Sequence, residues 1–207
     1  MHPNPTFRYV HQDRNLAYAA ERGFGTLAVA GEGGMPLLSH IPFLIEGDRA
    51  VFHLVRSNPI ARLAGNPLPG KLSVLGPESY VSPDWYGVED QVPTWNYVAV
   101  HLSGPVQLLP QDELHGVLDR LSDRFEAALL PKPIWKMSKV AEEPLQRLMR
   151  QIVPCAMQIT DVQGTWKLNQ NKADAVRLAA ADGVESHGLG SEVAALAALM
   201  RDPPASE

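Results

Sequence analysis

The prolines and glycines constrain this chain more than any other feature of its sequence. The 207 residues include 18 prolines and 16 glycines, and most of these lie between short apolar runs in the first 170 positions. Proline removes a backbone donor and glycine tolerates positive φ, so both residue types interrupt regular elements and favour turns. Frequent turns between short apolar runs are typical of a β-rich domain.

The first part of the chain predicts an antiparallel meander. It follows an extended arm and a short helix that Asp13 would cap and Gly23 would end. Three apolar runs then predict strands, at 24–30, 37–45 and 50–55. Glycine-containing turns at 32–34 and 46–48 separate these runs, so we expect consecutive strands to pair with each other.

The rest of the chain mixes strands with helices. We expect further strands at 71–75, 94–109 and 153–162, with a bend at Gly104-Pro105 and an irregular segment at 76–87. Helical spacing predicts helices over 114–125, around 145–149, from Asn171 to about 181 and from Ser191 to about 200. The simplest arrangement is one barrel-like domain over residues 1–189, followed by a C-terminal helix and a disordered tail over 190–207.

Composition and charge exclude several classes of protein. No apolar run is long enough to span a bilayer, and the N-terminus lacks the apolar core of a secretory signal. Cys155 is the single cysteine, so no intramolecular disulfide can form, and we expect a cytoplasmic protein. The formal net charge of −5 opposes strong non-specific binding to nucleic acid.

The segment HLVRSNP, residues 53–59, suits a phosphate group. Arg56 ends a predicted strand, and Asn58-Pro59 opens a predicted helix. A guanidinium offers a fork of donors that matches phosphate oxygens, and a helix N-terminus adds unpaired N–H groups. The alternative is a surface arginine paired with a carboxylate, with Asn58 acting only as a helix cap.

The segment GTWKLNQNK, residues 164–172, concentrates donors and acceptors. Lys167, Gln170 and Asn171 could hold a phosphate, a ribityl chain or the polar edge of a heterocycle. The alternative is a solvated turn between a strand and a helix, with Asn171 as the helix cap.

The aromatic strand TWNYV offers one further candidate surface. Strand alternation places Trp95 and Tyr97 on one face and Asn96 and Val98 on the other. One face should join the apolar core, and the other would be free for a ligand or a partner chain.

Motifs for metals, nucleophiles and dinucleotides are missing from the sequence. The seven histidines show no HxH or HExxH spacing, and the chain has no GxSxG, P-loop or GxGxxG motif. His53 and His101 fall in predicted strands, where each could be a buried structural residue. Cys155 lies in an apolar run and is expected to be buried and inert.

Four segments in order resemble the PaiB-type family of FMN-binding negative transcriptional regulators: HLVRSNP, GPESYVSPDWY, VPTWNYVAVH and WKLNQNK. The resemblance extends from the first residues to about Leu189. It implies a β-rich α+β fold, namely an FMN-binding split β-barrel with flanking helices, similar to pyridoxamine-phosphate oxidase. It also implies a homodimer, with each FMN in the cleft between the two chains.

The resemblance assigns roles to particular residues. Arg56 would clamp the FMN phosphate, with Ser57 and Asn58 adding hydrogen bonds. The backbone of Ser39, His40 and Ile41 would run along the flavin edge. The remaining residues would border the ring or close the site, one group from the aromatic strand and the other from GTWKLNQNK: Trp95, Asn96, Lys167, Gln170 and Asn171.

Three functions are compatible with the sequence. The first is a regulator of transcription, although an acidic chain without a helix-turn-helix makes direct DNA contact doubtful and leaves a regulatory protein partner or an altered metabolite as the route. The second is a flavin-dependent oxidoreductase that uses NAD(P)H, since one fold hosts many functions. The third is a haem-binding split barrel, with His40, His53 or His101 as an axial ligand.

Overall fold

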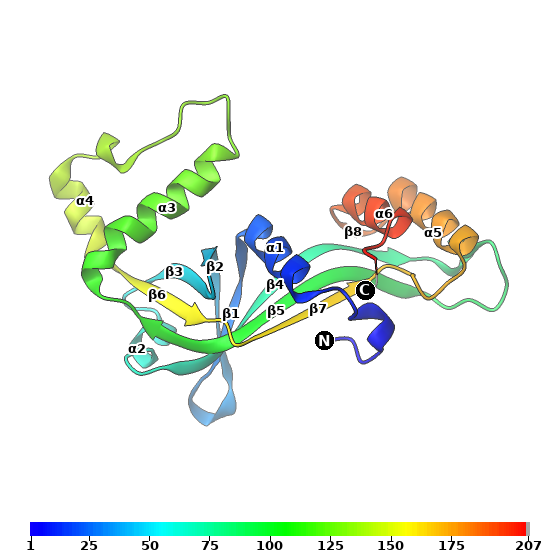
Figure 1. Ribbon diagram of the computed structural model, residues 1–207, viewed down its shortest axis with the longest axis horizontal. Coiled ribbons are helices and arrows are strands. Elements are labelled where there is room, and N and C mark those ends of the chain that lie inside the picture. Colours follow the sequence, from blue (N-terminus) through cyan, green and yellow to red (C-terminus); the bar gives the residue numbers. More distant parts are fainter. Residues whose placement is uncertain (206–207) are drawn as a thin grey trace. The chain divides into compact units, whose positions relative to one another are not determined.

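The structure is a computed structural model that describes residues 1–205, and these residues form two compact units. The Arg56 unit comprises Ala19–Ser73 and Leu102–Asp161, and the Lys167 unit comprises Met1–Tyr18, Val74–His101 and Val162–Glu207. Four elements contribute residues to both units: α1 (Gln12–Arg22), β4 (Leu68–Val81), β5 (Thr94–Leu108) and, by its first residue alone, β7 (Asp161–Lys167). Figure 1 shows the course of the chain.

The Arg56 unit contains the predicted meander. Strands β1 (Phe24–Ala30), β2 (Pro36–Glu46) and β3 (Arg49–Val55) are antiparallel, and β6 (Ile152–Gln158) pairs with β3. The first part of β4 pairs with β1, and the last part of β5 pairs with β6. Gly104 allows β5 to pass closely beside β6, because a Cβ there would lie 1.7 Å from the carbonyl oxygen of Gln158.

Three helices accompany these strands: α2 (Pro59–Leu63), α3 (Leu114–Ala127) and α4 (Glu142–Met149). Helix α3 packs on β3 and β6 through Val117 and Leu121, which meet Val51 and Ala156 in one apolar cluster. Figure 1 shows α3 and α4 beside this part of the sheet. The helical spacing between Leu114 and Phe125 therefore predicted both the helix and its buried face.

The Lys167 unit contains the rest of β4 and β5, which pair with each other, together with β7 (Asp161–Lys167) and the short β8 (Gly190–Ser191). Helices α5 (Asp174–His187) and α6 (Val193–Arg201) lie side by side (Figure 1). Their core includes Trp166, Leu168, Val184 and Met200. Short 3₁₀ turns complete the chain, at Pro5–Phe7, Glu32–Gly34, Pro83–Tyr86, Gln111–Glu113 and Met137–Lys139.

Two of the predicted strand boundaries were wrong. Residues 76–81, expected to be irregular, continue β4, and Gly76 packs so closely that a Cβ would overlap the Tyr18 hydroxyl. The single strand expected at 153–162 is two strands, β6 and β7. The prediction overlooked the short break at 159–160, because β6 is apolar and Val162 beyond the break was taken as its continuation.

The predicted helix caps were also wrong at three positions. The side chain of His11, one residue before α1, accepts a hydrogen bond from the Asp13 N–H at 3.3 Å, and Asp13 lies inside the first turn. Helix α5 begins after Ala173 rather than Asn171, and Glu192 in the left-handed region precedes α6 in place of Ser191. The predicted disordered tail includes residues 206–207, which lie outside the described part of the chain.

Candidate functional site

The predicted site residues fall into one group in each unit. Arg56, Ser57 and Asn58 follow β3 in the Arg56 unit, where Ser39, His40 and Ile41 lie on β2. Trp95, Asn96, Lys167, Gln170 and Asn171 belong to the Lys167 unit. Each group has a geometry of its own.

A side-chain hydrogen bond joins the two segments of the Arg56 group. The Asn58 amide nitrogen donates to the Ser39 hydroxyl at 3.1 Å. The other end of the same amide accepts from the Ile60 N–H at 2.9 Å, so Asn58 also caps α2 as the sequence predicted. One residue therefore fixes the chain after β3 against the middle of β2.

Backbone hydrogen bonds hold the Arg56 guanidinium in place. Its Nε donates to the Arg150 carbonyl at 3.0 Å, and its Nη2 donates to the Gln111 side chain at 2.9 Å and to the Ile152 carbonyl at 3.3 Å. Within residues 1–205, no carboxylate pairs with Arg56, and its Nη1 makes no hydrogen bond. The guanidinium is exposed, oriented and still able to donate.

Strand β2 presents an unpaired edge beside this group. Phe43–Glu46 pairs with β3, whereas Pro36–Pro42 pairs with β1 only. On the side away from β1, this stretch has no strand partner among the described residues. Ile41 is buried and offers only its backbone, while His40 is exposed and its Nδ1 lies 2.9 Å from the Thr26 hydroxyl.

Helix α2 contributes less than its sequence suggested. It has five residues, and Asn58 already occupies the N–H of Ile60 in its first turn. The macrodipole and free donors of so short a helix are small. Any anion at this corner would therefore depend on the side chains of Arg56 and Ser57.

The Lys167 group is largely engaged in hydrogen bonds within its own unit. The Lys167 ammonium donates to the Trp95 carbonyl at 2.8 Å and to the Thr94 hydroxyl, and burial lowers the pKa of this lysine. The Gln170 amide donates to the carbonyls of Thr6 and Trp166 and accepts from the Leu168 N–H at 2.8 Å. Asn171 is exposed.

Consecutive side chains at the start of β5 point to opposite faces of the strand, as alternation predicted. Asn96 is fully buried and donates to the Met200 sulfur of α6 at 3.5 Å, while its Oδ1 has no partner among the described residues. Trp95 lies on the opposite face and is about half exposed, at 48%. A ligand in this unit could therefore reach Trp95 but not the Asn96 side chain.

Two further residues of GTWKLNQNK, Asn169 and Lys172, were not assigned a role from the sequence and contact Tyr86 in this unit. Asn169 adopts positive φ and donates to the Tyr86 hydroxyl at 3.4 Å. The Lys172 ammonium lies 4.3 Å from the centre of the Tyr86 ring, a cation–π distance. Tyr86 belongs to the segment GPESYVSPDWY, and Asn169 and Lys172 belong to WKLNQNK. Only the fold shows that these two segments contact each other.

The described residues offer neither a reactive cysteine nor a cluster of metal ligands. Burial raises the pKa of the Cys155 thiol to about 12, so it is not a reactive nucleophile at neutral pH. No cluster of three or more His, Cys, Asp or Glu side chains suited to a metal occurs in the described residues. In the same part of the chain, no helix is both long and apolar enough to cross a membrane.

The antiparallel sheet and its flanking helices are those of a split-barrel protein. Residues 1–161 match the family described as "Putative FMN-binding domain", and the chain belongs to this family. The resemblance to the PaiB-type family is thereby confirmed, and so is the predicted fold class. Membership supports FMN as the cofactor and does not favour the oxidoreductase or haem alternatives.

Known relatives and structures agree with this assignment. The chain is 30% identical to the Bacillus subtilis protease synthase and sporulation protein PAI 2 over 170 residues, which cover 80% of each protein. It is 29% identical to an uncharacterized protein of Aspergillus fumigatus, covering 90% of this chain and 92% of that one. The FAD and haem binding protein of Mycobacterium smegmatis shares the fold, with a TM-score of 0.57 and 19% identity over 89% of this chain and 82% of that one.

Proposed function

We propose that the Arg56 group is the FMN phosphate site of this protein. The observation that supports it is the Asn58–Ser39 hydrogen bond, which brings an oriented arginine beside the unpaired edge of β2. Arg56 and Ser57 would bind the phosphate, and the backbone of Ser39, His40 and Ile41 would bind the polar edge of the flavin. The flavin supplies the redox chemistry, and these residues bind and orient it.

The donor set fits a phosphate monoester. Arg56 retains Nη1 as a donor and has no competing carboxylate among the described residues, while Ser57 is exposed and offers a hydroxyl. The carbonyls of Arg150 and Ile152 fix the guanidinium before any ligand arrives. A preorganised donor loses less conformational entropy on binding than a free surface arginine does.

Arg56→Ala tests the phosphate site directly. We expect FMN affinity to fall by about 1.5–3 kcal/mol, roughly ten- to a hundredfold, because the substitution removes a hydrogen bond to a charged group. Isothermal titration with FMN measures this loss. Riboflavin, which lacks the phosphate, should bind the wild type and the variant with the same affinity.

Arg49→Ala provides the matched control, because Arg49 lies at the opposite end of β3. Its FMN affinity should equal that of the wild type. Equal FMN affinity for Arg56→Ala and the wild type would show that the phosphate is bound elsewhere.

We further propose that the protein is a cytoplasmic homodimer. Several large apolar side chains of the Arg56 unit are more than half exposed: Phe24, Met35, Leu38 and Val55. Exposed apolar surface of this extent favours a protein interface, and most such interfaces are symmetric. Light scattering after size exclusion tests this, and a monomer at micromolar concentration would contradict it.

A regulatory role is the biological function that the relatives favour. The Bacillus relative is named protease synthase and sporulation protein PAI 2. The net charge of −5 opposes binding to the DNA phosphates, so this chain would act through a regulatory protein partner rather than by binding DNA directly. A gel-shift titration across salt concentrations tests direct contact, and sequence-selective DNA binding by the pure protein would contradict the indirect route.

A further inference from the structure

Gln111 connects Arg56 to two other segments of the Arg56 unit. It is the first residue of the 3₁₀ turn Gln111–Glu113, which follows β5, and it lies outside the four segments that resemble the PaiB-type family. Its Oε1 accepts a hydrogen bond from Arg56 Nη2 at 2.9 Å. Its Nε2 donates to the Ile152 carbonyl at 3.2 Å and to the Met149 carbonyl at 3.5 Å. A single side chain therefore ties the guanidinium to the start of β6 and the end of α4.

These contacts require an amide at position 111. Nε2 faces two carbonyl oxygens, which only a donor can satisfy, and Oε1 faces a guanidinium, which has donors only. A glutamate would place a second oxygen against the same carbonyls, and a methionine would make none of the three hydrogen bonds. The residue type at this position therefore matters as much as its place in the fold.

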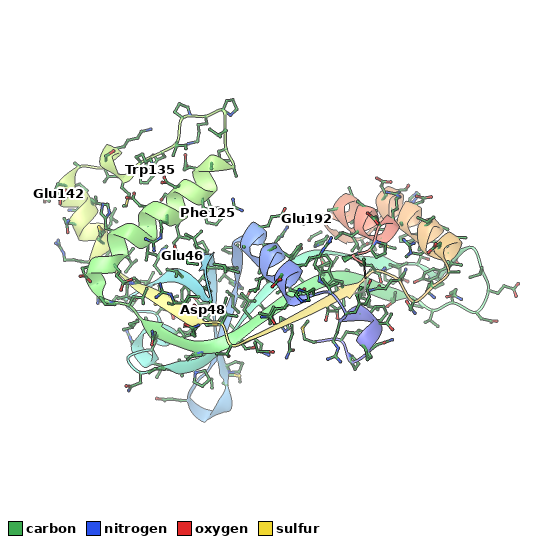
Figure 2. The ribbon with its side chains drawn as sticks, viewed as in Figure 1. Glu46, Asp48, Phe125, Trp135, Glu142 and Glu192 are labelled. Carbon is green, nitrogen blue, oxygen red and sulfur yellow. The ribbon has the colours of Figure 1, made fainter. Side chains whose placement is uncertain are left out.

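Gln111 also leaves the charge of Arg56 without a counter-ion. The two acidic residues of α4, Glu142 and Glu143, lie in its first turn, at the opposite end of the helix from Met149, and Figure 2 shows Glu142 there. Among the described residues, no carboxylate forms an ion pair with Arg56. The neutral amide therefore orients the guanidinium without competing with a charged ligand.

We propose that Gln111 is a positioning residue that makes the Arg56 group selective for the phosphate of FMN over an unphosphorylated flavin, an inference that rests on the proposed FMN site. Gln111 holds Nη2 and the Arg150 carbonyl holds Nε, so Nη1 is the guanidinium nitrogen left for the ligand. Without Gln111, Nη2 keeps only its longer hydrogen bond to the Ile152 carbonyl, at 3.3 Å. The less restrained guanidinium then loses more conformational entropy when it binds a phosphate.

Gln111→Met tests the positioning role, with isothermal titration of FMN and riboflavin as the measurement. Methionine keeps the length of the side chain and removes the amide. We expect FMN to bind about three- to tenfold more weakly, the range for one hydrogen bond, while riboflavin binds as it does to the wild type. Unchanged FMN affinity would overturn the proposal. Equal weakening of both flavins would reveal a general structural role and would overturn it as well.

Gln111→Glu changes the charge with almost no change of shape. The new carboxylate pairs with Arg56, so FMN affinity should fall by more than about tenfold and riboflavin affinity should stay the same. Gln107→Glu is the matched control, because Gln107 is exposed on β5 and makes no hydrogen bond with Arg56, and its FMN affinity should stay within about twofold of the wild type. Equal losses in Gln111→Glu and Gln107→Glu would assign the effect to net charge alone and overturn the proposal.

Combining Gln111→Met with Arg56→Ala shows whether Gln111 acts through Arg56. In the Arg56→Ala background, Gln111→Met should weaken FMN binding by less than about twofold, because the group that it positions is gone. A loss as large as in the wild-type background would show that Gln111 acts independently and would overturn the proposal. If Arg56→Ala weakens FMN binding and Gln111→Met does not, only the role of Gln111 fails. If Arg56→Ala has no effect, the phosphate site fails and this inference fails with it.

Discussion

The Arg56 and Lys167 groups contain similar polar residues but use them differently. The Gln170 amide donates both of its hydrogens to the carbonyls of Thr6 and Trp166, and Lys167 donates to Thr94 and Trp95. Arg56 also donates to carbonyls, at Arg150 and Ile152, but its Nη1 has no partner in the described chain. The Lys167 group connects segments of its own unit, while the Arg56 group leaves an exposed donor unused.

This difference is the reason for proposing that the Arg56 group binds the ligand while the Lys167 group stabilises the fold. Both segments look equally rich in donors along the sequence. Hydrogen-bonding capacity that the fold leaves unused is available to a ligand, whereas capacity spent on backbone carbonyls stabilises the fold. Substitutions in the two groups should therefore change different quantities.

Lys167→Met should produce the largest loss of stability in this comparison. It keeps the apolar stem of the side chain but removes the donor to the Trp95 carbonyl and the Thr94 hydroxyl. We expect the free energy of unfolding to fall by about 1–3 kcal/mol, measured by urea denaturation. The FMN affinity of the folded protein should change by less than about twofold.

Arg56→Ala serves as the reciprocal control for Lys167→Met. It should weaken FMN binding strongly while costing less unfolding free energy than Lys167→Met does. If Lys167→Met instead weakened FMN binding tenfold at unchanged stability, the distinction between the two groups would be lost.

The two units should also differ in how pH changes their stability: His53 of the Arg56 unit acts at acidic pH, and Lys167 of the other unit acts at alkaline pH. Burial lowers the pKa of His53, so below pH 6.5 the unfolded chain takes up a proton that the folded chain does not. Stability should fall as the pH drops below 6.5, by at most about 1.4 kcal/mol per pH unit from this group. Denaturation of the wild type and His53→Phe between pH 5 and 7 isolates the slope, which the variant should lack.

Lys167 gives the alkaline counterpart in the other unit. Its pKa is lowered by burial, so the unfolded chain holds its proton to higher pH than the folded chain does. The contribution of this group to stability should therefore rise as the pH approaches 10.5, and Lys167→Met should abolish that rise. An alkaline slope that persists in Lys167→Met would assign the effect to another group.

Asn96→Leu should have a smaller effect of opposite sign. Asn96 is fully buried, and its Oδ1 lacks a partner among the described residues. Replacing it with an apolar side chain of similar size removes this unpaired group, so we expect a gain of about 1 kcal/mol in thermal or urea unfolding. A loss of stability would mean that Oδ1 has a hydrogen-bond partner, such as a buried water, in the protein in solution.

Local patterns predicted most of the fold because they reflect local physics. The apolar stripe from Leu114 to Phe125 predicted α3, and the glycine turn at Gly47, with φ of 63°, joined β2 to β3 as expected. The caps of α1, α5 and α6 could not be predicted in this way. Asp13, Asn171 and Ser191 are all good capping residues, and tertiary packing selected other starting points.

The candidate site was predictable in its members but not in its arrangement. The segment HLVRSNP pointed to Arg56, Ser57 and Asn58, but the Asn58–Ser39 hydrogen bond joins residues 19 positions apart. Similarly, nothing in the sequence showed that Gln170 would meet Thr6, which lies 164 residues away. Contacts at such separations follow from strand order and register, which periodicity alone does not determine.

Asn171→Ala should change the free energy of unfolding least, and it tests whether Asn171 has a structural role like that of the other residues in the Lys167 group. Asn171 is exposed and precedes α5 without capping it. A surface substitution that breaks no cap changes unfolding free energy by about 0.5 kcal/mol or less, whereas removing a working asparagine cap costs about 1 kcal/mol. Urea denaturation distinguishes the two values. A loss near 1 kcal/mol would show that the side chain acts as a cap in solution, and a fall in FMN affinity at unchanged stability would transfer Asn171 to the binding group.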